Sequence, residues 1–225
     1  MKKTLVFLLT VLWCSASAAQ DQIPAYDWAN FQRYAAGNAT AGTAPLGVIM
    51  GDSIAEGWFL ADSAFFARNR LIGRGISGQV TAQMLVRFRR DVLDLKPKYV
   101  VIIGGINDIA RNQGYISQEN TLGNLASMCE LALLHGIEPI LTTLMPANRF
   151  FWRTNLPDTR EQIGAMNEKI RAYARENGFR LIDIEVLMAD ENGITQTSLS
   201  NDSVHPTLAG YKVFEQALLP QLINH

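Results

Sequence analysis

Five short apolar runs, separated by segments of helical periodicity, constrain the fold of this chain most strongly. The runs lack the apolar–polar alternation of strands that face water on one side, which is typical of strands covered on both faces. They occupy residues 46–50, 71–73, 99–103, 137–142 and 180–184. Helical patterns fall between them, at residues 81–95, 118–135 and 158–177, and Gly178 follows the last as a C-terminal cap.

This alternation of strand and helix predicts parallel pairing through right-handed crossovers. We therefore predict a single-domain, doubly wound (flavodoxin-like) α/β fold with about five parallel strands and helices on both faces. In such a sheet, the functional site lies at the C-terminal ends of the strands. One more helix is predicted at residues 27–36, where Trp28, Phe31 and Tyr34 recur at helical spacing.

Composition narrows the class of protein. A chain of 225 residues with 48% hydrophobic and 18% charged residues can form one well-buried domain but not two large ones. The formal net charge of -1 argues against nucleic acid or an anionic membrane as partner, because both need clustered positive charge. The one basic run, residues 87–90, is interpreted as a solvated helix face.

The N-terminus has the features of a signal peptide. Lys2 and Lys3 precede an apolar stretch at residues 5–13, and small residues follow up to Ala19. We predict a signal peptide at residues 1–19 and an exported domain, periplasmic or secreted, at residues 20–225. No stable membrane anchor is expected, because the apolar stretch is too short to span a bilayer.

The two cysteines do not predict a disulfide. Lipid attachment at Cys14 is the alternative to cleavage after Ala18 or Ala19, but the bulky Trp13 disfavours a lipoprotein signal. After cleavage, Cys129 is the only cysteine, so no intramolecular disulfide can form. Cys129 falls on an apolar helical stripe and is predicted to be a buried thiol.

Ser53 follows the first predicted strand and is the strongest candidate nucleophile. A serine needs a base to accept its proton and a third group to orient that base. The downstream segment 202–205 contains both an aspartate and a histidine, Asp202 and His205. From its position alone, Ser53 could equally be the N-cap of a helix. Of the other histidines, His135 is explained by its place at a helix C-terminus, and His225 ends the chain.

Four sequence blocks, in order, resemble those of the GDSL-type, SGNH-hydrolase superfamily. They are Gly51-Asp52-Ser53-Ile54, Ile76-Ser77-Gly78, Gly105-Ile106-Asn107-Asp108 and Asp202-Ser203-Val204-His205. Ile54 replaces the leucine of the family, a volume-conserving change. Ala55 stands where the G-x-S-x-G motif of α/β-hydrolases has its second glycine, so that motif is absent.

This resemblance implies a serine esterase or acylhydrolase that needs no cofactor. It assigns Ser53 as nucleophile, His205 as general base and Asp202 as the group that orients the histidine. The backbone N–H groups of Ser53 and Gly78 and the side-chain amide of Asn107 would form the oxyanion hole. Asp52 and Asp108 would hold the loops without taking part in a chemical step.

The substrate is less constrained than the reaction. The resemblance suggests short acyl groups, such as acetyl on carbohydrate. An aromatic segment at residues 146–153 could form a binding wall beside the site or could fold onto the core. The candidate substrate-binding residues are Trp58, Arg149, Phe151 and Trp152. The alternative functions are a non-catalytic carbohydrate-binding protein and a thioesterase or lysophospholipase.

No metal site is predicted. Asp183 and Glu185 lie close together at the fifth predicted strand, but no histidine or cysteine stands nearby to complete a ligand set.

Overall fold

The structure is a computed structural model that describes residues 26–40 and 44–223. The predicted signal peptide, its cleavage site and Cys14 lie outside the described residues. Within the described part of the chain, no helix is both long and apolar enough to cross a membrane.

Five parallel strands form one sheet in the order β2-β1-β3-β4-β5, which confirms the predicted fold class. All residues of β1 and β3, two of the three interior strands, are buried, as expected for strands covered on both faces. The strands are β1 (Gly47–Gly51), β2 (Leu71–Gly75), β3 (Tyr99–Ile103), β4 (Glu138–Thr142) and β5 (Arg180–Ile182).

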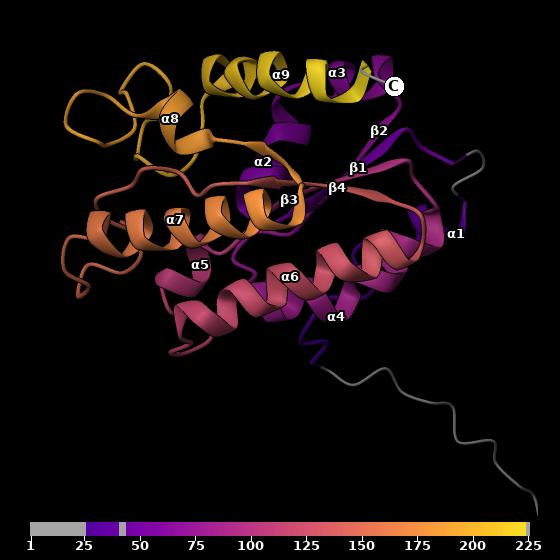
Figure 1. Cartoon of the computed structure of the whole chain (residues 1–225), viewed down its shortest axis with the longest axis horizontal. Coiled ribbons are helices and arrows are strands. Elements are labelled where there is room, and N and C mark those ends of the chain that lie inside the picture. Colours follow the sequence, from indigo (N-terminus) through magenta and orange to yellow (C-terminus); the bar gives the residue numbers. More distant parts are fainter. Residues whose placement is uncertain (1–25, 41–43, 224–225) are drawn as a thin grey trace, which may run out of the picture.

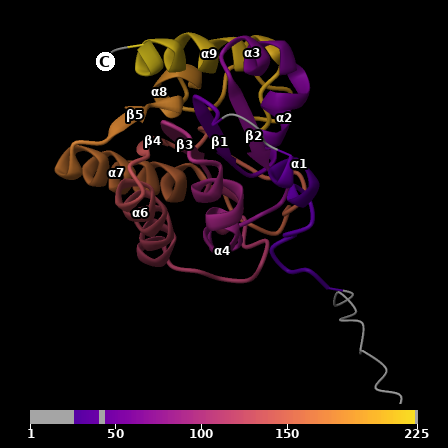
Figure 2. The same ribbon diagram turned by 90° about the vertical axis from the view of Figure 1, so that its right-hand side faces the viewer.

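Helices cover both faces of the sheet, as Figures 1 and 2 show. One face carries α2 (Ser53–Ala61), α3 (Ser63–Arg68), α8 (Ile184–Met188) and α9 (Leu208–Ile223). The other carries α1 (Ala35–Ala39), α4 (Thr81–Asp91), the 3-10 helix η1 (Leu93–Leu95), α5 (Ile106–Ile109), α6 (Gln118–Leu134) and α7 (Arg160–Asn177). Cys129 lies buried on α6, as predicted.

The strand register brings three sequence blocks to one edge of the sheet. Gly51, the last residue of β1, pairs with Gly75 of β2 on one side and with Ile103 of β3 on the other. The loops that follow these three strands therefore start at the same level. A glycine is needed at position 75, because a Cβ there would lie 2.0 Å from the backbone nitrogen of Glu56.

The predicted helix at residues 27–36 is wrong, since helix α1 begins only at Ala35. The Asp27 carboxylate accepts a hydrogen bond from the backbone N–H of Gln32 (3.0 Å), and the Asp27 carbonyl accepts one from Asn30. Asn30 adopts a φ of 55°, in the left-handed region. Local bonds of this kind compete with helix formation, and aromatic spacing alone did not reveal them.

Two helix starts in the C-terminal part of the chain set the end of β5 and the end of the loop that carries His205. Asp183 was expected to lie in the fifth strand, but it caps helix α8 by accepting a hydrogen bond from Val186 (3.3 Å). Helix α9 begins at Leu208, and the Thr207 carbonyl accepts the first helical hydrogen bond, from Tyr211. His205 therefore lies in the loop that precedes α9.

Candidate active site

Ser53, His205 and Asp202 form a continuous hydrogen-bonded chain. The Ser53 Oγ lies 2.9 Å from Nε2 of His205, and Nδ1 of the same ring lies 2.7 Å from Oδ2 of Asp202. The serine and the histidine are 152 residues apart in the sequence and meet only in the folded protein. This order of hydroxyl, imidazole and carboxylate is the arrangement of a Ser-His-Asp triad.

Hydrogen bonds within the loop before α9 fix Asp202 and His205 relative to each other. Oδ1 of Asp202 accepts hydrogen bonds from the backbone N–H groups of Val204 (2.9 Å) and His205 (2.7 Å). Burial acts to raise the pKa of Asp202, but these bonds and the His205 ring outweigh it, so the pKa lies below its ordinary value. The carboxylate therefore stays ionised, as it must to orient the ring and stabilise an imidazolium.

Asp52, and not Ser53, is the N-cap of helix α2. The buried Asp52 carboxylate accepts a hydrogen bond from the backbone N–H of Ile54 (3.0 Å). Ser53 is the first helical residue, and its hydroxyl is directed to His205 instead of capping the helix. The alternative interpretation of Ser53 as a capping residue is thus wrong. Burial raises the pKa of Asp52 to about 7.

Asp108 ties the third block to helix α4. Its carboxylate accepts hydrogen bonds from the backbone N–H (2.9 Å) and the hydroxyl (2.6 Å) of Thr81, the first residue of α4. Burial raises the pKa of Asp108. These contacts are of the loop-holding kind expected for this aspartate.

The Asn107 amide faces the same cavity as Ser53, with its nitrogen oriented by two neighbours. Nδ2 donates one hydrogen bond to the carbonyl of Gln79 (2.9 Å), while Oδ1 accepts one from Asn112 (2.8 Å). Among the described residues, the second N–H has only Asp52 Oδ2, at 3.4 Å, as a partner. A weakly engaged donor beside Ser53 is suited to bind a developing oxyanion.

Gly78 also borders this cavity and adopts a φ of 79°. A Cβ at this position would meet no atom within 4 Å. The need for glycine therefore comes from the left-handed backbone of the turn and not from lack of space around it.

Asn112 organises the site, although no sequence motif marked it. One side chain joins three parts of the cavity wall: Nδ2 donates to the Gly78 carbonyl (3.2 Å) and to Asn107, and Oδ1 accepts from Trp152 Nε1 (3.0 Å). Its role depends on loops that are distant in the sequence, so neither spacing nor residue type could have indicated it.

The cavity over Ser53 has a volume of about 230 Å³. Its lining consists of the hydrogen-bonded serine and histidine, residues of the second and third blocks, Asn112 and two aromatic residues, namely Ser53, Ser77, Gly78, Asn107, Asn112, Phe151, Trp152 and His205. The ring centroids of Phe151 and Trp152 lie 6.2 and 5.9 Å from that of His205. Arg149 is exposed and does not line this cavity.

Trp58 belongs to the core and not to the cavity. Its side chain is 1% exposed and packs among the rings of Phe65, Phe66, Tyr211 and Phe214. These residues come from α2, α3 and α9, so the cluster joins the helices of one face. Its position one turn after Ser53 placed Trp58 among the candidates, but that turn directs the indole into the interior.

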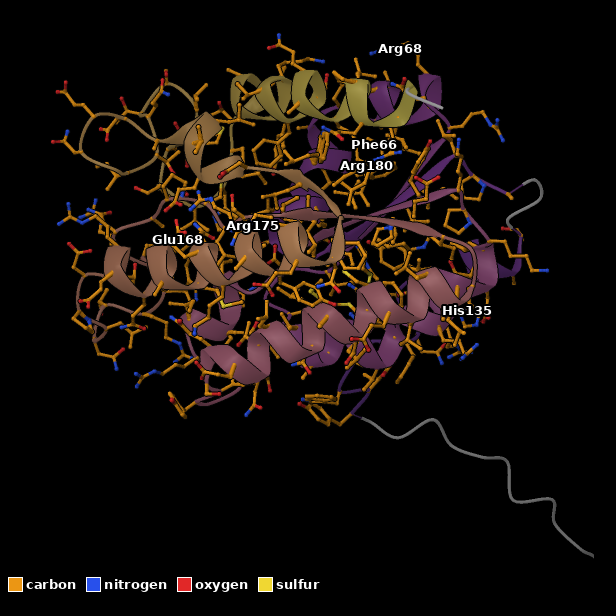
Figure 3. The ribbon with its side chains drawn as sticks, viewed as in Figure 1. Phe66, Arg68, His135, Glu168, Arg175 and Arg180 are labelled. Atoms are coloured by element: carbon orange, nitrogen blue, oxygen red, sulfur yellow. The ribbon has the colours of Figure 1, made fainter. Side chains whose placement is uncertain are left out.

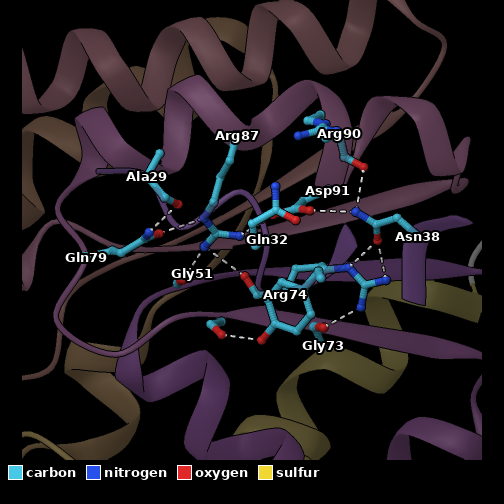
Figure 4. A network of polar contacts seen from close by, with 12 residues as sticks. Ala29, Gln32, Asn38, Gly51, Gly73, Arg74, Gln79, Arg87, Arg90 and Asp91 are labelled. Carbon is cyan, nitrogen blue, oxygen red and sulfur yellow. Dashed lines mark hydrogen bonds and ion pairs between the residues drawn. The ribbon is translucent and has the colours of Figure 1, made fainter. Parts of the chain in front are cut away.

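A buried polar network supports the loops of the site (Figure 4). Arg87 on α4 is fully buried and donates hydrogen bonds to the carbonyls of Gly51 (2.9 Å) and Arg74 (3.0 Å) and to the side chains of Gln79 (2.6 Å) and Asp91 (2.8 Å). It thus links the ends of β1 and β2 to the loop that carries Gly78. The interpretation of residues 87–90 as a solvated face is wrong for Arg87, whose charge is compensated internally.

Within residues 26–40 and 44–223, no three histidine, cysteine, aspartate or glutamate side chains are grouped so that they could hold a metal ion. Asp183 and Glu185, the acidic residues near β5, both bind an arginine side chain: Arg171 forms ion pairs with Asp183 (2.8 Å) and with Glu185 (2.7 Å).

Known proteins resemble this chain in both sequence and fold. The profile of the GDSL-like lipase/acylhydrolase family matches residues 49–213. The fold is similar to that of a GDSL-like lipase from Bacteroides thetaiotaomicron, with a TM-score of 0.83 and 41% identity over 86% of this chain and 97% of that one. A structure from Bacteroides fragilis has a TM-score of 0.84, with 40% identity over 88% of this chain and 97% of that one.

Two curated proteins are also similar in sequence. An acetylxylan esterase from Geobacillus stearothermophilus is 24% identical over 163 residues, which are 68% of this chain and 72% of that protein. An uncharacterized lipoprotein of Bacillus subtilis, YqeF, is 40% identical over 79 residues. That second match spans 34% of this chain and only 32% of the lipoprotein.

Proposed function

Since this chain belongs to the GDSL-like lipase/acylhydrolase family and is a carboxylic ester hydrolase, we propose that it removes short acyl groups, principally acetyl, through a Ser-His-Asp acyl-enzyme mechanism. The observation that carries the proposal is the hydrogen-bonded chain from Ser53 through His205 to Asp202, which opens into the cavity that Gly78 and Asn107 border.

In the first half-reaction, Ser53 Oγ attacks the ester carbonyl carbon while its proton moves to Nε2 of His205. Asp202 stabilises the resulting imidazolium. The carbonyl oxygen becomes an oxyanion, which accepts hydrogen bonds from the N–H groups of Ser53 and Gly78 and from Nδ2 of Asn107. Collapse of this intermediate breaks the ester C–O bond, and the leaving alcohol takes the proton from His205.

In the second half-reaction, water attacks the acyl-enzyme. His205 accepts a proton from that water, the oxyanion forms again on the same donors, and Ser53 leaves with the proton returned by the imidazolium. The products are the carboxylic acid and the free enzyme. Apart from the ester and one water molecule, both half-reactions use only groups of this chain.

The size of the cavity supports a short acyl group. Its 230 Å³ is below the range of about 300–1,000 Å³ typical of sites for drug-sized ligands. The bulky side chains of Phe151 and Trp152 restrict it further on the His205 side. The similarity to an acetylxylan esterase is consistent with the same acyl group.

A chain-length series of p-nitrophenyl esters tests this proposal. We expect kcat/KM to be highest for the acetate and at least roughly 10-fold lower for the octanoate, because an eight-carbon chain lacks apolar burial in so small a cavity. A preference for the octanoate would instead favour a lipase. Absence of turnover of every ester would favour a non-catalytic binding protein, and faster cleavage of acyl thioesters or lysophospholipids would favour those alternative activities.

Replacement of Asn107 by alanine is expected to lower kcat by roughly 10²–10³, the usual effect of removing one oxyanion donor. KM should change much less, since the amide contacts charge that develops only during the attack. Steady-state kinetics with p-nitrophenyl acetate measures both constants. Asn120→Ala, on the exposed start of α6, is the matched control. A normal kcat in Asn107→Ala would show that this side chain only holds the loop.

We also propose that the protein is exported by way of residues 1–19. The basic and apolar pattern of this segment and the similarity to a lipoprotein support export. Intact-mass measurement of the protein recovered from the cell exterior would identify the mature N-terminus.

A further inference from the structure

A second, larger groove adjoins the cavity of the nucleophile. Its volume is about 500 Å³, and it shares Ser77, Gly78, Asn112 and Trp152 with the smaller cavity. Its far wall is the N-terminal segment 26–30, which precedes the sheet and contributes none of the residues of the triad or the oxyanion hole. A substrate bound at Ser53 can therefore extend past Gly78 and Asn112 towards this segment.

The wall of the larger groove combines aromatic rings with uncharged polar groups. Tyr26 is 71% exposed and Trp28 is 39% exposed, and Trp152 forms part of the boundary with the smaller cavity. Asn30 and Gln113, which carry side-chain amides, line the same groove. Ring faces pack against the C–H surfaces of sugar rings, while amides donate to and accept from sugar hydroxyl groups.

Charge distinguishes this groove from one built for phosphate. Asp27 lines it, whereas no lysine or arginine does so within the described part of the chain. A lysophospholipid headgroup or coenzyme A carries phosphate, which is ordinarily bound by cations. A neutral, hydroxyl-rich leaving group suits this wall better than either.

The segment that carries Trp28 is fixed in place by side chains from the residue after the second block and from α4. Gln79 donates to the carbonyl of the buried Ala29 (2.8 Å), and Gln83 donates to the carbonyl of Trp28 (2.6 Å). The Trp28 indole N–H donates to Gln113 at 3.4 Å. Because backbone and ring are both held, binding here would require little ordering of the protein.

From this groove we infer that the enzyme acts on acetylated oligosaccharides, with the acetyl group in the cavity over Ser53 and the saccharide in the groove against Trp28. The inference rests on the proposed function and specifies its leaving group. The groove holds the sugar on the alcohol side of the ester, so the deacetylated saccharide leaves along the groove while the acyl-enzyme remains.

The test compares ethyl acetate, whose leaving group has no ring to stack on Trp28, with chemically acetylated xylo-, manno- and chito-tetraose. Trp28→Ala removes the ring but keeps the backbone carbonyl that Gln83 binds. We expect kcat/KM on the best tetrasaccharide to fall roughly 10-fold, the effect of one lost stacking contact, while that on ethyl acetate changes less than about twofold. Tyr115→Ala is the matched control, because this exposed ring lies outside the groove.

A binding measurement separates a saccharide contact from a structural effect. Ser53→Ala protein, which cannot turn substrate over, is titrated calorimetrically with the same acetylated tetrasaccharides. Binding should be measurable and should weaken about 10-fold when Trp28→Ala is added. Equal losses on both substrate types, or none, would overturn the inference. So would turnover of ethyl acetate with no turnover of any tetrasaccharide, whereas inactivity on every ester would refute the proposed function itself.

Discussion

Ser53→Ala protein is expected to lose roughly 10⁶-fold in kcat on p-nitrophenyl acetate, the scale seen when a triad serine is removed. It should also fail to react with a fluorophosphonate probe that modifies the wild-type protein. The reason is that Ser53 Oγ is the atom in contact with Nε2 of His205, at 2.9 Å. Peptide mapping by mass spectrometry should place the adduct of the wild-type protein on Ser53.

The chain contains a close control for this substitution. Asp62 caps α3 by accepting a hydrogen bond from Phe65 (2.9 Å), and Ser63 is the first residue of that helix, so the local structure repeats that of Asp52 and Ser53. Ser63 is exposed. Ser63→Ala should retain full activity and labelling. Labelling that persists in Ser53→Ala, or an adduct on another residue, would contradict the assignment.

His205→Ala is expected to lower kcat by a similar factor, roughly 10⁶. A triad acts as a unit, so removal of either the serine or the histidine abolishes most of its effect on the rate. Without the imidazole, Ser53 has no group to accept its proton, and the leaving alcohol has no donor. Circular dichroism and urea unfolding should show a folded protein, and partial recovery of turnover in added imidazole would support loss of the base alone.

His135→Ala is the matched control for this second substitution. His135, labelled in Figure 3, follows α6 and precedes β4, so it lies at the N-terminal ends of the strands, whereas the loops of the site follow their C-terminal ends. Its Nδ1 contacts the carbonyl of Leu131 (2.8 Å), one helical turn earlier. Its removal should leave turnover nearly unchanged. If His135→Ala abolished activity and His205→Ala did not, the general base would be assigned wrongly.

The sheet could be predicted because buried parallel strands and amphipathic helices have different periodicities. Each predicted apolar run overlaps an observed strand, with ends that differ by a few residues. The predictions for two short segments were wrong because local side-chain hydrogen bonds compete there with the predicted helix or strand. The Asp27 turn prevented the predicted N-terminal helix, and the capping bond of Asp183 ended β5 early.

The candidate site was predictable to the extent that its residues stand in sequence blocks. Ser53, Gly78, Asn107 and His205 all line one cavity. Residues whose place depends on long-range packing could not be judged in this way. Trp58 was a candidate by its distance from Ser53 but points into the core, whereas Asn112 had no such signal and contacts three parts of the wall.

The separation of 152 residues between Ser53 and His205 affects when activity can arise during synthesis. In the proposed mechanism, the nucleophile and the oxyanion donors belong to the first half of the chain, but the base enters with the last loop before α9. We therefore expect a nascent chain to be inactive until nearly all of it has emerged and its C-terminal helix has docked. Esterase activity would thus report the completion of folding, and chains that terminate before His205 would be inactive.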